Sequence, residues 1–346
     1  MKRILLIGGG HAHLAVLRSL VKEPLHGARF ALVSPRAKQM YSGMLPGVVA
    51  GHYRRLEAEI DLARLAEAAY AEFIEGEVAK LDHDRRVATL HDGAELEYDL
   101  VSLNVGSLVE RPFPGAGLAL AAKPFDVFFE KLRTTRLNRV AIAGAGPAGA
   151  ELAMALRYRG AAVTLYSDKA ELSPARMEPM LRGMGVDLRP GMAVTAIEPG
   201  PQVIAGASRQ EFDLVILTTG AAPQPWLRGG GLACDERGFV LVEDTLQSVS
   251  HPEVFAAGDC ATLRSAAVPK SGVYALRQGE TLSANLRHVM QDAPLVPYRP
   301  QRHALLLVSC GRRYAIAQRG GWSAEGRWVW WWKDRIDRAW MKSLTV

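Results

Sequence analysis

Two stretches of this chain each combine a short apolar run, a glycine-rich turn and a helical pattern. The first, KRILLIGGGHAHLAVL, covers residues 2–17, and the second, RVAIAGAGPAGAELAMALRYRGAAVTLYSD, covers residues 139–168. In both, a predicted buried strand leads into the glycines, a predicted helix follows, and a second strand comes after the helix. This order is that of a βαβ unit, so the sequence predicts an α/β fold with two Rossmann-like dinucleotide-binding domains.

The second glycine turn carries the complete G-x-G-x-x-G spacing, with Gly144, Gly146 and Gly149. The first glycine permits a tight turn, and the second lets backbone N–H groups approach a pyrophosphate at the start of the helix. The third glycine lets the helix pack closely on the strand. A fingerprint set between a predicted strand and a predicted helix predicts a nucleotide site.

The first turn keeps Gly8 and Gly10 but has His13 in the third place. Because that place serves helix packing, we expect a modified site whose N–H groups on His11 and Ala12 still face a pyrophosphate. We expect His13 itself to be wedged between helix and sheet rather than to act in catalysis. The residues that should bind a ribose are also unusual, since the first unit ends in Ser34-Pro35-Arg36 and the second in Ser167-Asp168. The choice between NADH and NADPH therefore stays open.

Composition sets outer limits on the fold and its partners. The 346 residues are 49% hydrophobic, which is enough for two cores. The net charge of +6 suits an anionic partner without selecting one, and no nucleic acid is expected. Cys234, Cys260 and Cys310 form no C-x-x-C pair, so we expect no metal site, no local redox disulfide and a cytoplasmic setting.

A further stretch, HPEVFAAGDCATL at 251–263, places Gly258 and Asp259 after a short apolar strand. With the two βαβ units, it resembles the two-dinucleotide-binding-domain flavoproteins of the pyridine nucleotide-disulfide oxidoreductase superfamily, in which such an Asp binds FAD. The resemblance implies four parts along the chain. These are an FAD domain in two pieces (1–111 and 235–296), an NAD(P) domain inserted between them (112–234), and a small C-terminal α+β region (297–346).

Within that superfamily the chain lacks the C-x4-C of the disulfide reductases. Its segments VSPRAKQMYSGMLPG (33–47) and VPKSGVYALRQGETLSANL (268–286) resemble the type II NADH dehydrogenase-like branch that is sometimes fused to selenophosphate synthetase. The resemblance implies FAD contacts from Gly8, Gly10, His11, Ala12, Ser34, Pro35, Arg36, Leu45, Pro46, Val78, Gly106, Gly258, Asp259 and Lys270. It implies NAD(P) contacts from Gly144, Gly146, Gly149, Glu151, Asp168 and Gly220.

Two of these residues are the candidate catalytic groups. Reduced flavin gathers negative charge, so a helix that begins near Gly272, capped by Ser271 and flanked by Lys270, would stabilise it. In the family that the chain resembles, an acid at the position of Glu151 faces the nicotinamide. The simpler alternatives are a solvated lysine beside an ordinary helix, and a first-turn acid that stabilises a helix dipole.

The resemblance implies an FAD-dependent NAD(P)H dehydrogenase that passes electrons to a quinone-like or other two-electron acceptor. A sulfide:quinone reductase-like or a selenium-related reductase is the alternative within the same class. Sulfide chemistry needs two thiols facing the flavin, and neither Cys234 nor Cys260 stands at such a position in the sequence. An FAD-binding regulatory protein without turnover is the alternative of another class, and the complete second fingerprint argues against it.

The C-terminal stretch GGWSAEGRWVWWWKDRIDRAWMKSL (320–344) holds six of the seven tryptophans. Basic residues accompany them, which is typical of a segment at a membrane interface, so a peripheral place on the inner face of the cell membrane is one expectation. A homodimer or core patch is the alternative. Helical spacing predicts an amphipathic helix with its apolar face formed by Trp332, Ile336, Trp340 and Leu344.

Overall fold

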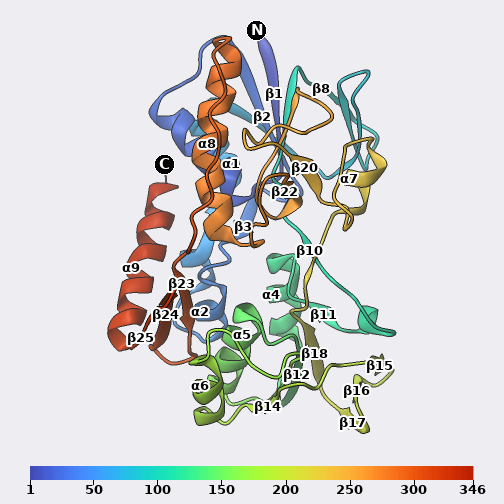
Figure 1. The fold of residues 1–346 in the computed structure, drawn as a ribbon, viewed down its shortest axis with the longest axis vertical. Coiled ribbons are helices and arrows are strands. Elements are labelled where there is room, and N and C mark those ends of the chain that lie inside the picture. The colour runs from blue at the N-terminus through green and yellow to red at the C-terminus, as the bar shows by residue number, and fades with distance from the viewer. Residues whose placement is uncertain (346) are drawn as a thin grey trace.

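The computed structural model describes residues 1–345 and contains two separate parallel sheets, one in each half of the molecule (Figure 1). The first sheet has the strand order β21-β9-β1-β2-β5. Its strands are β1 (Lys2–Ile7), β2 (Ala28–Ser34), β5 (Ala71–Glu75), β9 (Leu100–Leu103) and β21 (Val254–Ala256). The second sheet has the order β11-β18-β12-β13-β14. Its strands are β11 (Leu120–Ala121), β12 (Arg139–Ala143), β13 (Ala162–Tyr166), β14 (Asp187–Arg189) and β18 (Leu214–Leu217).

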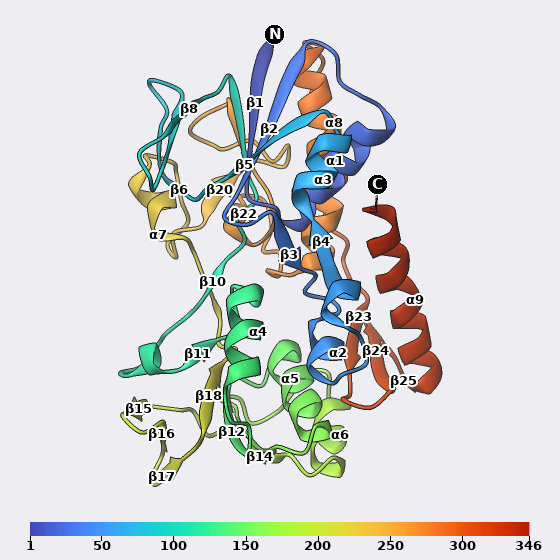
Figure 2. The same cartoon turned by 180° about the vertical axis from the view of Figure 1, so that it is seen from behind.

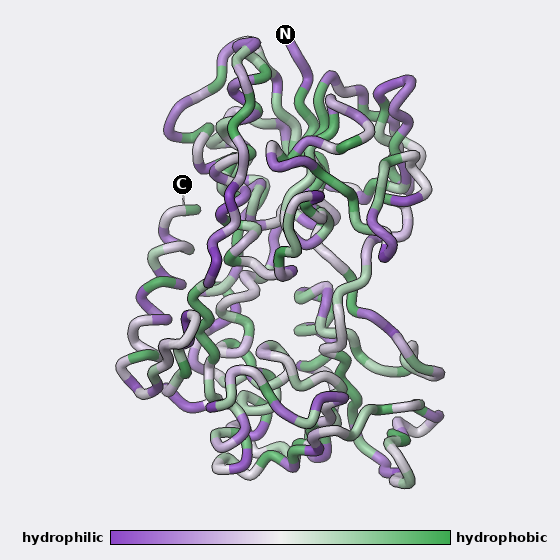
Figure 3. The backbone as a smooth tube through the Cα atoms, viewed as in Figure 1, coloured by the Kyte–Doolittle hydropathy of each residue, from purple (hydrophilic) through white to green (hydrophobic). Residues whose placement is uncertain are grey.

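Each predicted βαβ unit forms the centre of its own sheet. In the first, β1 and β2 pair in parallel around helix α1 (His11–Lys22), which coincides with the helix that the sequence predicts over residues 11–22. In the second, β12 and β13 pair in parallel around α5 (Pro147–Tyr158). β1 changes from hydrophilic at the N-terminus to hydrophobic further along (Figure 3), and burial follows the same order, since Lys2 and Arg3 are exposed and Ile4–Ile7 are buried. The predicted fold class of two Rossmann-like domains is confirmed.

Further helices cover the sheets. In the first half they are α3 (Leu62–Ala68) and α8 (Gly272–Met290), and α8 packs along α1. Between the halves lie α2 (Leu45–Val49) and α4 (Phe125–Thr134), and in the second half α6 (Met177–Gly183). α7 (Pro225–Gly229) packs against β6 (Val78–Asp82) of the first half.

Short antiparallel strands complete the two halves. The first half carries β3 (Lys38–Met40), β4 (Glu59–Asp61), β6 (Val78–Asp82), β7 (Val87–Leu90), β8 (Glu95–Glu97), β20 (Val240–Val242) and β22 (Ala261–Leu263), of which β20 and β22 pair in parallel. The second half carries β15 (Ala196–Glu198), β16 (Gln202–Ala205) and β17 (Ser208–Glu211). Three single 3₁₀ turns are η1 (Arg55–Ala58), η2 (Ala116–Leu118) and η3 (Gly258–Cys260).

The chain crosses between the halves through two short strands that pair with each other. These are β10 (Leu108–Val109) and β19 (Ala221–Ala222), which run antiparallel in the narrow part of the molecule (Figure 1). Leu227 and Leu232 then pack in the core of the first half, although the sequence assigned them to the inserted domain. The domain boundaries at residues 112, 235 and 297 therefore stay predictions, and these two side chains favour a return near residue 225.

The C-terminal region consists of an antiparallel sheet and one long helix, which lies along one side of the molecule (Figure 2). Its elements are β23 (Leu306–Ser309), β24 (Ala315–Arg319), β25 (Trp322–Gly326) and α9 (Arg327–Ser343). The predicted apolar face of α9 is divided in the structure, because Trp340 and Leu344 are buried in the core of the first half but the other two residues are not. Trp332 and Ile336 are 36% and 40% exposed, whereas Lys333, Asp334 and Asp337 are buried. Three charged side chains of α9 therefore face the interior of the protein.

No helix within residues 1–345 is both long enough and apolar enough to cross a membrane.

Candidate functional site

The first candidate site lies at the carboxyl ends of β1, β9 and β21, where two helices begin close together. Gly10 is the N-cap of α1, and Gly272 is the first residue of α8. A Cβ atom added to Gly272 would lie 3.3 Å from the His11 Nε2 atom, so little space separates the two helix starts. Because both helix N-termini carry partial positive charge, this edge of the sheet favours an anionic group such as a pyrophosphate.

A buried asparagine occupies part of the predicted phosphate-binding turn. Asn104 Oδ1 accepts hydrogen bonds from the N–H groups of Ala12, at 2.9 Å, and His13, at 3.2 Å. Asn104 Nδ2 donates to the Ala257 carbonyl at 2.6 Å, so the side chain links α1 to the end of β21. The expectation that the Ala12 N–H faces a phosphate is therefore wrong. Among the hydrogen bonds of residues 1–345, none uses the N–H of Gly10 or His11, and these two remain for a ligand.

His13 lies fully buried between α1 and the sheet. Its Nδ1 lies 2.6 Å from the Gly8 carbonyl oxygen, and its Nε2 lies 2.8 Å from Ser102 Oγ. A carbonyl can only accept, so Nδ1 carries the proton and Nε2 accepts from the serine hydroxyl. Burial lowers the pKa of His13 to about 4, which keeps the ring neutral. The predicted packing role of His13 is confirmed.

Asp259 stands in η3, directly after β21, and holds a cation from the other half of the molecule. Lys123 Nζ lies 2.8 Å from Asp259 Oδ2 and 3.0 Å from Ser107 Oγ, and that hydroxyl donates to the same carboxylate oxygen at 3.2 Å. Lys123 belongs to the segment between β11 and α4, so the ion pair joins the two sheets. Burial lowers the pKa of the nearby His11, Asp259 opposes that shift, and Lys123 adds to it.

Lys270 lies next to the start of α8, but its ammonium group contacts β22 and Phe239. Its Nζ donates to the Ala261 carbonyl and, at 3.0 Å, to Thr262 Oγ1, and it lies 4.0 Å from the centre of the Phe239 ring. Burial lowers the pKa of its ammonium. Ser271 is the N-cap of α8, but its side chain makes no capping hydrogen bond, so that expectation is wrong. The role of Lys270 toward a flavin stays a prediction.

The other predicted FAD contacts fall into three places. At the end of β2, Ser34 is buried while Pro35 and Arg36 are exposed, and the Ser34 carbonyl accepts from the Gly76 N–H close to Val78. Val78 itself is a core residue. Gly106 follows β9 with φ of +69°, and nothing lies within 4 Å of a Cβ atom built on it. Gly258 starts η3, and its N–H donates to Gln278 of α8.

Leu45 and Pro46 form the start of α2. Both are buried, and Leu45 belongs to the core of the second half. α2 packs against α5, so this segment bridges from the first sheet to the second glycine unit. The predicted FAD contacts of Leu45 and Pro46 stay a prediction.

The second candidate site follows β12. Gly144 has φ of +109°, and Gly146 is the N-cap of α5 with nothing within 4 Å of an added Cβ atom. A Cβ atom on Gly149 would lie 1.9 Å from the Gly144 carbonyl oxygen, so only glycine fits there. This turn has open space where a pyrophosphate would lie. Asp168 is exposed after β13, and Gly220 lies in the crossing between β18 and β19, where its carbonyl accepts from the Glu110 N–H.

Glu151 is the fifth residue of α5 and is partly buried; it lies beyond the first turn of the helix, so the alternative of a first-turn acid is wrong. Its Oε1 accepts from the Ser309 N–H at 2.7 Å, which ties it to the end of β23. Burial raises the pKa of Glu151 to about 7, while Lys333 and the Ser309 N–H oppose the shift. A carboxyl group with this pKa can both hold and release a proton near neutral pH.

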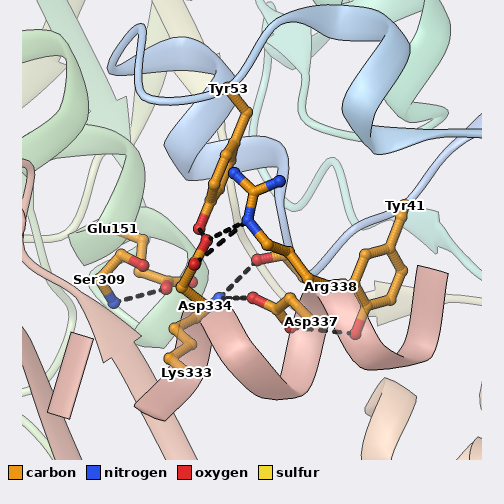
Figure 4. A network of polar contacts seen from close by, with 9 residues as sticks. Tyr41, Tyr53, Glu151, Ser309, Lys333, Asp334, Asp337 and Arg338 are labelled. Carbon is orange, nitrogen blue, oxygen red and sulfur yellow. Dashed lines mark hydrogen bonds and ion pairs between the residues drawn. The ribbon is translucent and has the colours of Figure 1, made fainter. Parts of the chain in front are cut away.

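A polar network lies close to Glu151 on the inner face of α9 (Figure 4). Lys333 Nζ donates to the Gly43 carbonyl and to Asp337 Oδ2, both at 2.6 Å. Tyr41 OH donates to Asp337 Oδ1 at 3.3 Å, and Tyr53 OH donates to Asp334 Oδ1 at 2.7 Å. α9 is therefore fixed to the segment 41–53, which contains the predicted FAD contacts Leu45 and Pro46.

Sequence reasoning missed several of these residues because their partners are remote in the chain. Asn104 and Lys123 contact residues more than 90 positions away, and Lys333 contacts Gly43 290 positions away. No local spacing pattern contains such a pair. A weak signal was present in KDRID, residues 333–337, where opposite charges at i and i+4 can face one another on a helix.

The residues of the first site fit the phosphate and sugar part of FAD. Two helix starts converge, two N–H groups are without protein partners among residues 1–345, and Asp259 offers a carboxylate beside them. The second site fits a second dinucleotide, because its cradle at Gly146 is open and its turn has full glycine spacing.

Comparison with known proteins agrees with this geometry. Residues 2–279 match the family model described as pyridine nucleotide-disulphide oxidoreductase. The chain belongs to this family. The match confirms the family expected from the sequence and, with it, an FAD-dependent NAD(P)H oxidoreductase.

Three relatives illustrate the range of the similarity. The chain is 26% identical to ferroptosis suppressor protein 1 of Xenopus tropicalis over 352 residues, which cover 92% of this chain and 89% of that one. It is 30% identical to the nitric oxide reductase FlRd-NAD(+) reductase of Salmonella agona (strain SL483) over 290 residues, covering 77% and 74%. The structure of the sulfide:quinone oxidoreductase of Aquifex aeolicus superposes with a TM-score of 0.82 at 18% identity, covering 99% and 91%.

Proposed function

We propose that this chain uses NAD(P)H to reduce a quinone at the surface of a membrane, and that α9 is the element that lies on that surface. When bound, FAD supplies the two-electron exchange between the nucleotide and the acceptor. The observation that carries the proposal is the orientation of α9, in which Trp328, Trp331 and Trp332 are exposed while both carboxylates of the helix are buried.

The outer face of α9 has the composition of an interfacial segment. Trp328, Trp331, Trp332 and Ile336 are 36–56% exposed, and the rings of Trp328 and Trp332 stack with centres 6.4 Å apart. The exposed charges of the helix are all basic, since Asp334 and Asp337 are its only acids and both are buried. Indole rings prefer the headgroup level, and each basic residue near an anionic surface adds roughly 1 kcal/mol of attraction.

The inner face of α9 connects this surface to the second glycine unit. Lys333 and Asp337 lie near enough to Glu151 to shift its pKa in opposite directions. Reduction of a quinone consumes protons, and Glu151, with a pKa of about 7, is a group that can hold and pass one at neutral pH. We propose that the acceptor approaches from the α9 side for this reason, with Glu151 as its proton-handling residue.

The printed names of two relatives are in line with a quinone or a nicotinamide reaction. One solved structure of this fold is a sulfide:quinone oxidoreductase, and one relative in sequence is an NAD(+) reductase. Sulfide as the electron donor is not favoured by the thiols of this chain. Cys260 and Cys310 belong to two different cores, and burial raises the pKa of each to about 11 and about 12, so neither is a ready nucleophile.

The test removes the outer tryptophans without disturbing the inner network. A triple variant, Trp328→Ser, Trp331→Ser and Trp332→Ser, should keep its FAD and its NAD(P)H-dependent reduction of a soluble dye. It should bind anionic vesicles at least roughly tenfold more weakly and lose activity toward a long-chain quinone, because less apolar area inserts at the headgroup level. Co-sedimentation with vesicles and quinone reductase assays measure both effects.

The control is Leu118→Ser, which removes an exposed apolar side chain from η2, away from α9. Truncation of α9 would be a poorer test, because Val329, Trp330 and Trp340 belong to the two large cores. Unchanged vesicle binding by the triple variant, together with a change of oligomeric mass in light scattering, would contradict the membrane proposal and favour a dimer contact.

A further inference from the structure

Two histidines and a glutamate meet at the edge of the first sheet that is opposite the nucleotide site. His83 follows β6, and His251 and Glu253 lie in the turn that enters β21. One ligand atom from each of the three lies within 4.8 Å of the other two, and all three side chains are partly buried. β21 runs parallel to β9, so its first residues lie at the amino edge of the sheet, whereas Asp259 follows its carboxyl end.

The backbone holds this group in place from both sides. The Val254 N–H donates to the His251 carbonyl at 3.0 Å, which closes a turn that presents His251 and Glu253 together. The Val101 N–H donates to the Glu253 carbonyl at 3.0 Å, which anchors the same turn to β9. The imidazole rings of His83 and His251 stack with centres 4.2 Å apart.

In each imidazole ring, one nitrogen lies within hydrogen-bonding distance of a hydroxyl oxygen, and the other nitrogen has no hydrogen-bond partner among residues 1–345. His83 Nδ1 lies 3.2 Å from the hydroxyl of the buried Tyr98, and His83 Nε2 is buried without a hydrogen-bond partner among residues 1–345. His251 Nδ1 lies 2.8 Å from Ser250 Oγ, which leaves its Nε2. Histidines that bind metals characteristically donate their second N–H to such an oxygen, which orients the ring and fixes the tautomer.

The buried Nε2 of His83 is the second observation that points to a ligand. A buried imidazole nitrogen without a partner is costly, and a metal ion would satisfy it.

We propose that His83, His251 and Glu253 bind a zinc ion, with water at the fourth position. Two imidazoles and one carboxylate suit Zn²⁺ better than Mg²⁺ or Ca²⁺, which prefer oxygen ligands. Ligand atoms of a tetrahedral zinc site are about 3.4 Å apart. Because the three ligand atoms lie within 4.8 Å of one another, the side chains need to approach by at most about 1.4 Å on binding. The ion would tie the turn after β6 to the turn before β21 and would not take part in electron transfer.

The experiment measures zinc binding to the FAD-loaded protein by calorimetry, together with the shift of its thermal midpoint. The wild-type chain should bind one Zn²⁺ and melt at a higher temperature when zinc is present. His251→Gln and Glu253→Gln should each weaken binding at least tenfold and remove the thermal shift. Both should keep FAD and dye reduction at wild-type levels, which also checks that they fold.

Two matched variants complete the test. His91→Gln removes an exposed histidine just beyond β7, in the same part of the first half, and Cys234→Ser removes the half-buried thiol. Both should bind zinc as the wild type does. The proposal would be overturned if the wild type bound no saturating equivalent of zinc. It would also be overturned if Cys234→Ser lost the binding while Glu253→Gln kept it.

Discussion

The two glycine turns of this chain use different side chains to fill the space beside a glycine carbonyl and to donate a hydrogen bond to it. Each has a glycine carbonyl, on Gly8 or Gly144, that faces the space between the helix and the next strand of the sheet. In the second turn, Thr218 Oγ1 donates to the Gly144 carbonyl at 2.7 Å and Gly149 leaves room for it. In the first turn, His13 donates to the Gly8 carbonyl from the position that Gly149 occupies in the second.

The residue that follows the neighbouring strand, β9 in the first sheet and β18 in the second, also differs between the two turns. Asn104 and Thr218 occupy equivalent places, because each follows the residue that pairs with the last residue of the central strand, Leu103 with Ile7 and Leu217 with Ala143. Asn104 caps α1, whereas Thr218 bonds to the turn itself. The third glycine of the fingerprint is therefore required only where the neighbouring strand already fills the space.

The largest effect should come from placing a histidine, as in the first turn, at the third glycine position of the second turn. Gly149→His should unfold the second half or destabilise it by at least about 3 kcal/mol, because even a Cβ atom there would lie 1.9 Å from the Gly144 carbonyl oxygen. Thermal unfolding and reduction by NADH measure the loss. Gly149→Ala tests the same clash with the smallest side chain, and Gly183→Ala, in open space, is the control. A fully stable Gly149→His protein would contradict the comparison.

The reverse exchange should be milder. His13→Gly should retain FAD but lose roughly 2–4 kcal/mol of unfolding free energy, through a cavity, two missing hydrogen bonds and a glycine within α1. Urea unfolding gives the stability, and the absorbance of the bound flavin gives the FAD content. Loss of FAD from a folded His13→Gly protein would assign His13 a direct part in cofactor binding and refute its packing role.

A smaller effect is the pH dependence of the unfolding free energy, which His13 gives to the first turn and which the second turn lacks. The pKa of His13 falls from an ordinary value of 6.5 to about 4 in the folded chain, so between these values the unfolded chain binds a proton that the folded chain does not. The contribution of His13 is complete above pH 6.5 and is lost as the pH falls toward 4. Between pH 7 and pH 5 this amounts to roughly 2 kcal/mol. Urea unfolding at both pH values should reveal it in the wild type and not in His13→Gly; equal losses in both proteins would argue against it.

Local sequence predicted those parts of the fold that depend on neighbouring residues. The bounds of α1, the start of α8 at Gly272 and the turns at Gly8 and Gly144 all follow from short-range patterns. The packing of His13 could also be foreseen, because the third fingerprint position has a known structural role.

Long-range partners explain what could not be predicted. Helical spacing placed Trp332 and Ile336 on one apolar face of α9 with Trp340 and Leu344. Tyr41, Gly43 and Tyr53 instead supply partners for the buried charged side chains, and Trp332 and Ile336 stay exposed. Lys270 is similarly drawn away from the start of α8 by β22 and Phe239. In both cases a partner outside the helix determines where the charged side chain lies. The periodicity of the helical sequence contains no information on that partner.

The central claim is that the two turns act as a pair, the first holding FAD and the second presenting NAD(P)H to it. Anaerobic titration of the FAD-containing protein with NADH and with NADPH tests this claim most directly. At least one of the two nucleotides should bleach the flavin absorbance at about 450 nm, with one nucleotide consumed per flavin. A protein that contains FAD and is bleached by neither nucleotide would contradict the account.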